Sequence, residues 1–430
     1  MAPKRKIQIK NQKASRSRWN NQVEEEVMEE PNCSIYKKVQ PDIAVLSTLV
    51  QGTNFRKARL GAAIQGNSFP SKSTFYRHQQ TMIPKITEKA SLAIENQAEE
   101  TFSQEDVHVS IDGRYDSCRN AMNCTTSLID CRRNKVVHME SANKKDLDIA
   151  SNMLESAAAR KTFDYIKEKY GADSCTTMTS DNDNKTPSQA RKSGLDVNRT
   201  FDPRHGLNSI ARNFPKIANK YDYECYFPDI LEGKRVKIVS WAVYLVNNFE
   251  DIELRGLKWT NSPFHMIGQH ENCSHGPLPP SHKDWEEGKT NLEAFQKMQN
   301  FFNNTVKFIK ACDFRNTTQC NESLNNLISM LAPKRLHFAS SYNVRALLAG
   351  GLYNDPHFFS KLIIDLDLNK YVPKQSMDEI VSFENEREQE ILKKRTLQYR
   401  DNKNKYRKKK YSKKESEGDY NEDKKEIYFD

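Results

Sequence analysis

The feature that most constrains the fold of this chain is an alternation of apolar and polar residues that begins at Val107. Val107, Val109 and Ile111 alternate with polar side chains, which is the period of a half-buried strand. Two more strand-like stretches follow at residues 122–129 and 135–139, and turn-like polar residues separate them. The pattern therefore predicts three consecutive antiparallel strands.

The hydrophobic period changes to that of a helix after the third strand. Apolar residues line one side of residues 147–170, and Gly171 is a natural end for that helix. Strands are predicted at residues 175–180 and 198–201, with a short helix between them at residues 188–192. We therefore expect an α/β chain with a mixed sheet flanked by helices, and the order of its elements resembles the RNase H-like fold.

Composition and period divide the chain into six regions. They are a disordered basic N-terminus (1–38), a helix-turn-helix-like module (39–90), the first part of an RNase H-like core (105–214), a helical insertion (215–310), the C-terminal helices of the core (311–370) and a charged tail, helical or disordered (371–430).

The second of these regions, residues 39–90, reads as three short helices. The last helix is expected to start near Ser71, and Ser71 and Ser73 are both suitable N-caps. In a helix-turn-helix arrangement the first residues of that helix face base edges and phosphates. The predicted DNA contacts there are Lys72, Thr74, Tyr76 and Arg77. The same pattern is equally compatible with a small helical bundle that only packs against the rest of the protein.

The charge of the chain favours a polyanionic partner. The 67 Lys and Arg residues exceed the 57 Asp and Glu residues, which gives a formal net charge of +10. Cationic side chains displace the counterions condensed on nucleic acid, although a basic protein without such a partner has the same composition. Basic clusters at residues 3–6 and 407–410 resemble nuclear-import signals, and we expect a nuclear location.

The cysteines predict a reducing compartment. There are nine, an odd number at irregular spacings, and no signal-peptide pattern opens the sequence. They are expected to be free thiols or metal ligands instead of a disulfide framework. No apolar run is long enough to cross a bilayer, so no membrane partner is expected.

Two acidic residues stand at the ends of predicted strands. Asp112 is followed by Gly113, which permits an abrupt exit of the chain, and Asp181 follows a strand of small residues. If these strands are neighbours, both carboxylates lie at one edge of the sheet and share a divalent cation. An Asp-Gly pair is also a common turn, and Asp183 competes with Asp181 as the ligand.

A third acid, Glu322, lies near the start of a predicted amphipathic helix that also carries Asn325. Residues three apart share a helix face, so Glu322 and Asn325 are expected to point in similar directions. A glutamate on a first helical turn is also a favourable partner of the helix dipole, and this explanation is sufficient for Glu322 taken alone.

Taken together and in order, these segments resemble the DDE transposases, in particular the Mutator-like group and its uncharacterised eukaryotic relatives. The resemblance covers roughly residues 105–350. Its motifs are Ile111-Asp112-Gly113, Ser180-Asp181, Phe201-Asp202-Pro203-Arg204-His205, Asn321-Glu322 with Asn325, Pro333-Lys334 and Ser341-Tyr342-Asn343-Val344-Arg345.

The resemblance implies a metal-dependent transposase. In that family the three acids hold two divalent ions, Mg²⁺ or Mn²⁺, which implies Asp112, Asp181 and Glu322 as catalytic residues here. The implied reaction is cleavage and strand transfer of double-stranded transposon ends, with a homo-oligomer as the expected assembly. The alternative is a catalytically silent, transposase-derived nuclear DNA-binding protein, and a nuclease of the same fold is the nearest enzymatic rival.

A compact group of histidines and a cysteine predicts a zinc site in the insertion. His270, Cys273 and His275 are spaced closely enough for tetrahedral coordination, with His265 or His282 as the fourth ligand. The resemblance supports this site, because related transposases carry a Cys/His motif between the second Asp and the Glu. A polar loop whose histidines only form hydrogen bonds is the alternative.

His205 follows a predicted strand and precedes a predicted helix. It is expected either to contact DNA phosphate near the acidic residues or to play a structural part at the helix start. The tryptophans Trp241 and Trp259 are expected to belong to a hydrophobic core and not to stack on bases.

Overall fold

The computed structural model describes residues 41–181, 185–218, 224–226, 235–266, 269–273, 292–313, 317–399, 401–403 and 405–406. The predicted disordered N-terminus and both predicted nuclear-import signals lie outside these residues. The described chain is α/β, as predicted, and most of its residues are helical. Among its helices, none has the length and hydrophobicity that crossing a lipid bilayer requires.

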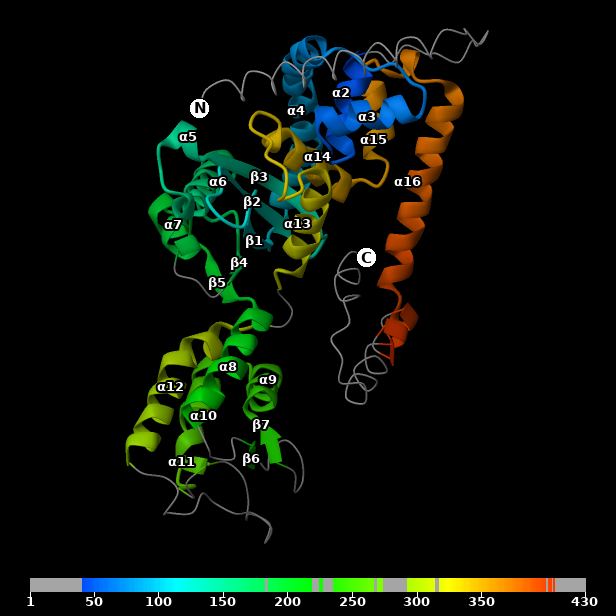
Figure 1. Ribbon diagram of the computed structural model, residues 1–430. Helices are drawn as coiled ribbons and strands as arrows, with labels where there is room; N and C mark the ends of the chain where they lie inside the picture. The colour runs from blue at the N-terminus through cyan, green and yellow to red at the C-terminus, as the bar shows by residue number, and fades with distance from the viewer. Residues whose placement is uncertain are drawn as a thin grey trace, which may run out of the picture.

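A five-stranded mixed sheet lies at the centre of the larger lobe, with the strand order β3-β2-β1-β4-β5 (Figure 1). β1, β2 and β3 are antiparallel, whereas β4 and β5 run parallel to β1. The order of strands and helices along the chain agrees with the prediction. The strands are β1 His108–Tyr115, β2 Asn123–Asp130, β3 Lys135–Asn143, β4 Thr177–Ser180 and β5 Asn198–Phe201.

One face of the sheet is covered by α6 (Leu154–Tyr170), against which α7 (Lys185–Ser193) packs. The alternating residues Val109 and Ile111 belong to this apolar layer. The predicted helix over 147–170 is shorter in the structure, because α5 (Lys144–Leu147) ends at Asp148 and the 3-10 turn η1 (Ser151–Met153) comes before α6. Asp148 has a left-handed φ of 48°, which stops a helix.

The other face of the sheet packs against α4, α13 and α14, in one core with the N-terminal helices. These helices are α2 Pro41–Val50, α3 Phe55–Ile64, α4 Lys72–Phe102, α13 Gln319–Leu331 and α14 Tyr342–Asn354. α15 (Phe358–Asp365), the 3-10 turn η2 (Asn369–Tyr371) and α16 (Lys374–Arg395) follow. Residues near the start and the end of the described chain therefore share a hydrophobic core.

The helix that begins at Lys72 is much longer than predicted. The short third helix of the N-terminal module and the helical connector after it form one helix of 31 residues, and Pro84 does not interrupt it. Its buried residues recur at helical spacing along almost its whole length, so a continuous apolar stripe holds it against the core. They are Phe75, Gln79, Met82, Ile86, Ala90, Ile94, Ala98 and Thr101.

The second lobe is the predicted helical insertion, which follows β5 and has its own core (Figure 1). Trp241 and Trp259 are buried there, as predicted, with exposed fractions of 4% and 0%. Its helices are α8 Pro203–Ala218, α9 Ile238–Asn248, α10 Ile252–Thr260, α11 Ser262–Met266 and α12 Leu292–Ala311. The sequence did not predict the small antiparallel sheet of β6 (Glu224–Tyr226) and β7 (Arg235–Lys237).

Candidate functional site

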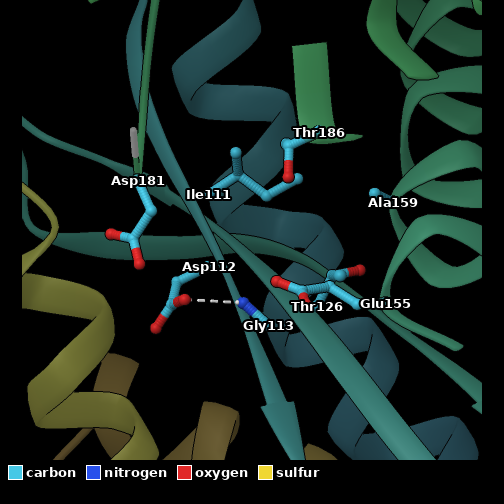
Figure 2. Close-up of a pocket in the computed structure, with 8 residues that line it drawn as sticks. All are labelled: Ile111, Asp112, Gly113, Thr126, Glu155, Ala159, Asp181 and Thr186. Atoms are coloured by element: carbon cyan, nitrogen blue, oxygen red, sulfur yellow. Dashed lines mark hydrogen bonds between the residues drawn. The ribbon is translucent and has the colours of Figure 1, made fainter. Parts of the chain in front are cut away.

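Asp112, inside β1, and Asp181, directly after β4, lie beside each other. The predicted exit of the chain at Asp112-Gly113 is wrong, because β1 stays paired with β2 as far as Tyr115. β1 pairs with β4 so that Ser110 is opposite Thr179, which places Asp112 and Asp181 at the same level two residues further on. Both line one pocket, and Figure 2 shows their carboxylates on the same side of β1. The lining residues are Ile111, Asp112, Gly113, Thr126, Glu155, Ala159, Asp181 and Thr186.

The environment of Asp112 in this pocket raises its pKa. Burial, followed by repulsion from Asp181, raises the pKa of Asp112 to about 7. One oxygen of Asp112 accepts a hydrogen bond from the backbone amide of Gly113 at 2.8 Å. A divalent cation between the carboxylates would relieve the repulsion and displace the proton, and an all-oxygen donor set suits a hard cation such as Mg²⁺.

Helix α13 reaches this pair through its asparagines. Asn325 donates a hydrogen bond to the second oxygen of Asp112 at 2.7 Å. Asn321 is fully buried and binds both antiparallel strands: it accepts from Ser110 at 2.6 Å and donates to the carbonyl oxygen of Ser127 at 2.8 Å. These bonds fix the first two turns of α13 against β1 and β2.

Glu322 stands on the same helix, one turn before Asn325, and is not among the residues that line the pocket. Its carboxylate accepts a hydrogen bond from Arg204 at 3.0 Å. The structure therefore brings Asp112 and Asp181 into direct proximity, and it connects Glu322 to them through Asn325 on one side and through the start of α8 on the other.

Asp202 fixes the starts of two helices at once. One of its oxygens caps α8 by accepting from the amides of Arg204 and His205, at 2.7 and 3.3 Å. The other accepts from the amide of Thr318, immediately before α13, at 2.8 Å. Burial of Asp202 opposes its ionisation, but these hydrogen bonds outweigh burial and lower its pKa. Asp202 thus positions Arg204, His205 and α13 around the site.

We predict that Asp202→Asn destabilises the protein by about 1–3 kcal/mol at pH 7, because a charged acceptor of several buried hydrogen bonds becomes a neutral amide. The lowered pKa means that Asp202 stabilises the fold above the pKa of the unfolded chain and stops doing so as pH falls through the lower folded value. Urea unfolding at pH 7 and near pH 3 measures this. Equal stability of variant and wild type at pH 7 would contradict the assignment.

His205 lies between the acids and the start of α8. Its Nδ1 is 3.2 Å from an oxygen of Asp181 and 3.7 Å from an oxygen of Asp202, and 46% of its side chain is exposed. The structure thus places His205 at the site, where it contacts an acidic residue directly and remains accessible to a ligand.

Glu155 is an acidic residue of the pocket that the sequence prediction missed. It stands on the first turn of α6, and Figure 2 shows it across β1 from Asp112 and Asp181. A Cβ atom at Gly113 would lie 2.6 Å from the Glu155 side chain, so the glycine makes room for this carboxylate. The Tyr115 hydroxyl donates to it at 3.1 Å. An acid on a first helical turn is too common a pattern to have revealed this role.

Three of the predicted zinc ligands gather in the second lobe. The ligand atoms of His265, His270 and Cys273 all lie within 4.8 Å of one another. His265 Nδ1 is 3.3 Å from Cys273 Sγ and 3.2 Å from His270 Nδ1, and His265 is 4% exposed. The predicted ligand His275 and the alternative His282 lie outside the described residues.

The predicted DNA contacts at the start of α4 have different environments. Lys72, Tyr76 and Arg77 are exposed, whereas Thr74 is half-buried and its amide donates to the N-cap Ser71 at 3.2 Å. The Tyr76 ring is 5.9 Å from the Phe55 ring, so it also takes part in packing between α3 and α4.

The fold and the site define an α/β protein with a carboxylate pair at the junction of antiparallel and parallel strands. No protein-family model matches the chain, and no curated protein matches its sequence.

Proposed function

We propose that this chain is a metal-dependent DNA transposase of the DDE type, which cleaves DNA and joins the ends, with Asp112, Asp181 and Glu322 as its cation ligands. The observation that carries the proposal is the side-by-side placement of Asp112 and Asp181, with Asn325 of α13 bound to Asp112. Mg²⁺ or Mn²⁺ are the ions that this donor set favours.

The topology supports an RNase H-like assignment. An antiparallel β3-β2-β1 meander extended by the parallel strands β4 and β5 matches the order expected from that resemblance. The long insertion between β5 and α13 also matches the place where the resemblance expects one. These features concern the fold, so the activity depends on the chemistry of the site.

Two divalent ions at such a site would activate a water or a 3′-hydroxyl group and stabilise the leaving oxygen of a phosphodiester. The protein side chains have separate tasks. Asn325 orients Asp112, and Asp202 holds Arg204 and His205 at the rim. Arg204 balances the charge of Glu322 and, with 59% of its side chain exposed, remains available to a phosphate.

The rest of the proposal concerns the setting of this reaction. Double-stranded DNA is the proposed partner, supported by the net charge of +10. We also propose a nuclear location and a homo-oligomeric state for this protein. The second candidate function is a silent, transposase-derived DNA-binding protein, and the favouring observation is that Glu322 pairs with Arg204 and does not line the pocket.

A cleavage assay separates the two candidates. Purified protein is incubated with supercoiled plasmid in Mg²⁺, in Mn²⁺ or in EDTA, and nicked, linear and joined products are counted. We expect metal-dependent products, and a loss of about 100-fold in rate for Glu322→Gln. Glu386→Gln, at an exposed position of α16, is the matched control. DNA binding without cleavage in either metal would favour the silent protein, and cutting without joining would favour a nuclease.

We also propose that His265, His270 and Cys273 bind Zn²⁺, with His275 or His282 as fourth ligand. One thiolate and imidazole nitrogens are a donor set that zinc accepts. We predict about one equivalent of Zn²⁺ per chain, lost in Cys273→Ser and retained in Cys118→Ser, which changes an exposed free cysteine. Chelator titration with metal analysis measures this, and His275→Ala and His282→Ala identify the fourth ligand. Equal zinc content in Cys273→Ser would refute the site.

A further inference from the structure

Residues 43–87 expose no acidic side chain. This stretch contains no Asp or Glu, but it contains six Lys or Arg residues, and the structure exposes all of them. They are Arg56, Lys57, Arg59, Lys72, Arg77 and Lys85. No ion pair joins any of these six to another described residue. Asp42, at the edge of the stretch, is bound to His78 at 2.7 Å.

Helix α3 is the most exposed element of this region. Phe55 is its only buried residue, and a side chain added at Gly61 would meet nothing within 4 Å. Leu60 and Ile64 are 61% and 78% exposed. Arg56 and Leu60 are four residues apart, as are Leu60 and Ile64, so the three lie along one face of the helix. Arg59 is three residues after Arg56, so the two arginines are neighbours on the helix surface and make this side of α3 positively charged.

We infer that α3 is the helix that enters the major groove of duplex DNA and that the start of α4 only contacts phosphates. An α-helix fits a groove about 12 Å wide, and the small residues Gly61 and Ala63 of α3 allow its backbone to approach closely. Arginines recognise guanine edges, and apolar side chains such as Leu60 contact thymine methyl groups. The inference rests on DNA as the partner in the proposed function.

The start of α4 is less suited to reading bases, because its side chains are used for packing and capping. Ser71 caps the helix, Thr74 bonds to Ser71, and Phe75 is 1% exposed. The Tyr76 ring packs against Phe75 at 5.4 Å. Lys72 and Arg77 remain exposed, and long cationic side chains at a helix start suit phosphate contacts.

The turn before α3 is attached to the helix that carries Glu322. Gly52 has a φ of +60°, and a Cβ there would lie 1.8 Å from the carbonyl oxygen of Met330, near the end of α13. Glu322 and Met330 are about 12 Å apart along the helix, and α3 is about 15 Å long. Both lengths together are less than one turn of DNA, about 34 Å. The turn before α3 therefore lies at the opposite end of α13 from Glu322, at a separation along that helix of less than one turn of DNA.

The test measures binding in EDTA, so that it does not depend on cleavage. The full chain is titrated into a fluorescent 40-base-pair duplex at several salt concentrations. Arg56→Glu with Arg59→Glu is expected to weaken binding at least 10-fold and to lower the slope of log K against log salt by about 2. Lys374→Glu with Lys393→Glu, at exposed positions of α16, makes the same change of charge and is expected to weaken binding less than 3-fold.

Further variants separate α3 from α4. Lys72→Glu with Arg77→Glu is expected to weaken binding to all sequences equally, whereas Leu60→Gln with Ile64→Gln is expected to change the sequences enriched from a random duplex pool. An unchanged affinity of the Arg56/Arg59 variant, or an unchanged sequence preference of the Leu60/Ile64 variant, overturns the inference. So does binding to phosphatidylserine vesicles through α3 without binding to the duplex.

These outcomes are distinct from failure of the proposed function. Cleavage that persists with the α3 variants on pre-bound DNA would leave the catalytic proposal intact while removing the role of α3. Duplex binding through α3 by a protein that never cleaves DNA would keep the role of α3 and remove the catalytic proposal. Melting temperatures of all variants are recorded, and Arg56→Gln with Arg59→Gln replaces the glutamate variant if that variant does not fold.

Discussion

Asp112→Asn is expected to abolish metal-dependent DNA cleavage, with a rate loss of about 10³-fold or more, and to stabilise the metal-free protein at the same time. The cleavage rate falls because an amide is a poor ligand for a cation that a carboxylate pair would hold. The stability of the metal-free protein rises because burial and Asp181 raise the pKa of Asp112 to about 7, so its ionised form is unfavourable in the folded state.

The sign of the pH dependence follows from this raised pKa. Between about pH 4 and pH 7 the folded chain binds the Asp112 proton more tightly than the unfolded chain, so the contribution of this group to stability falls as pH rises. Above pH 7 Asp112 is ionised in the folded and the unfolded chain, and the full free-energy cost of holding its charge in the folded protein remains. We therefore expect Asp112→Asn to raise the free energy of unfolding at pH 8 in EDTA by about 1–3 kcal/mol, allowing for its partial exposure, and to have little effect near pH 4.

Urea unfolding in EDTA and in about 10 mM Mg²⁺ measures the stability part of this prediction, and the plasmid cleavage assay measures the loss of rate. The metal is expected to stabilise the wild type and not the variant, because ligands that bind only the folded state add to its stability. Asp148→Asn is the matched control, since Asp148 is exposed and asparagine tolerates its left-handed backbone. An Asp112→Asn protein that is less stable at pH 8 and still cleaves would contradict the assignment.

Arg345→Met is expected to cause the largest loss of stability, about 3–5 kcal/mol. Arg345 is 2% exposed, and its guanidinium donates to the carbonyl oxygens of Leu49, Leu331, Thr48 and Thr53. It also lies over the ring of Phe338 at 4.0 Å. The substitution leaves several buried carbonyl oxygens without their donor, although it keeps much of the side-chain volume.

The consequence of Arg345→Met reaches beyond global stability. The bonds of Arg345 join the end of α2 and the turn before α3 to the end of α13. Hydrogen exchange is therefore expected to increase first in α2 and in the last turn of α13. The stability of Arg345→Lys is expected to lie between those of the wild type and Arg345→Met, because a single ammonium group cannot reach all these acceptors.

Arg119→Met, at an exposed arginine, is the control and should change stability by less than about 0.5 kcal/mol. Equal melting temperatures for the two methionine variants would refute the structural role.

Local patterns were enough to predict most elements of the sheet. The alternation at Val107 and the helical period before Gly171 depend only on neighbouring residues, and the structure has strands and a helix there. The strand-end position of Asp181 was predicted from the same patterns. The predicted end of the first strand at Asp112 was wrong, because pairing with β2 continues β1 to Tyr115, and the parallel pairing of β1 with β4 places the two acids together. The length of α4 was not predicted, because contacts with α14 and β3, far away in the sequence, keep that helix continuous past Pro84.

The sequence by itself determined the α/β class, the order of the strands along the chain and the position of Asp181 at a strand end, because these depend on periodicity within a few residues. Only the tertiary structure decided that Asn325 binds Asp112, that Glu155 shares the pocket, and that Asp202 caps one helix while binding the start of another. Those contacts join segments from about 40 to more than 200 positions apart, and their strength comes from burial and geometry that no local pattern contains.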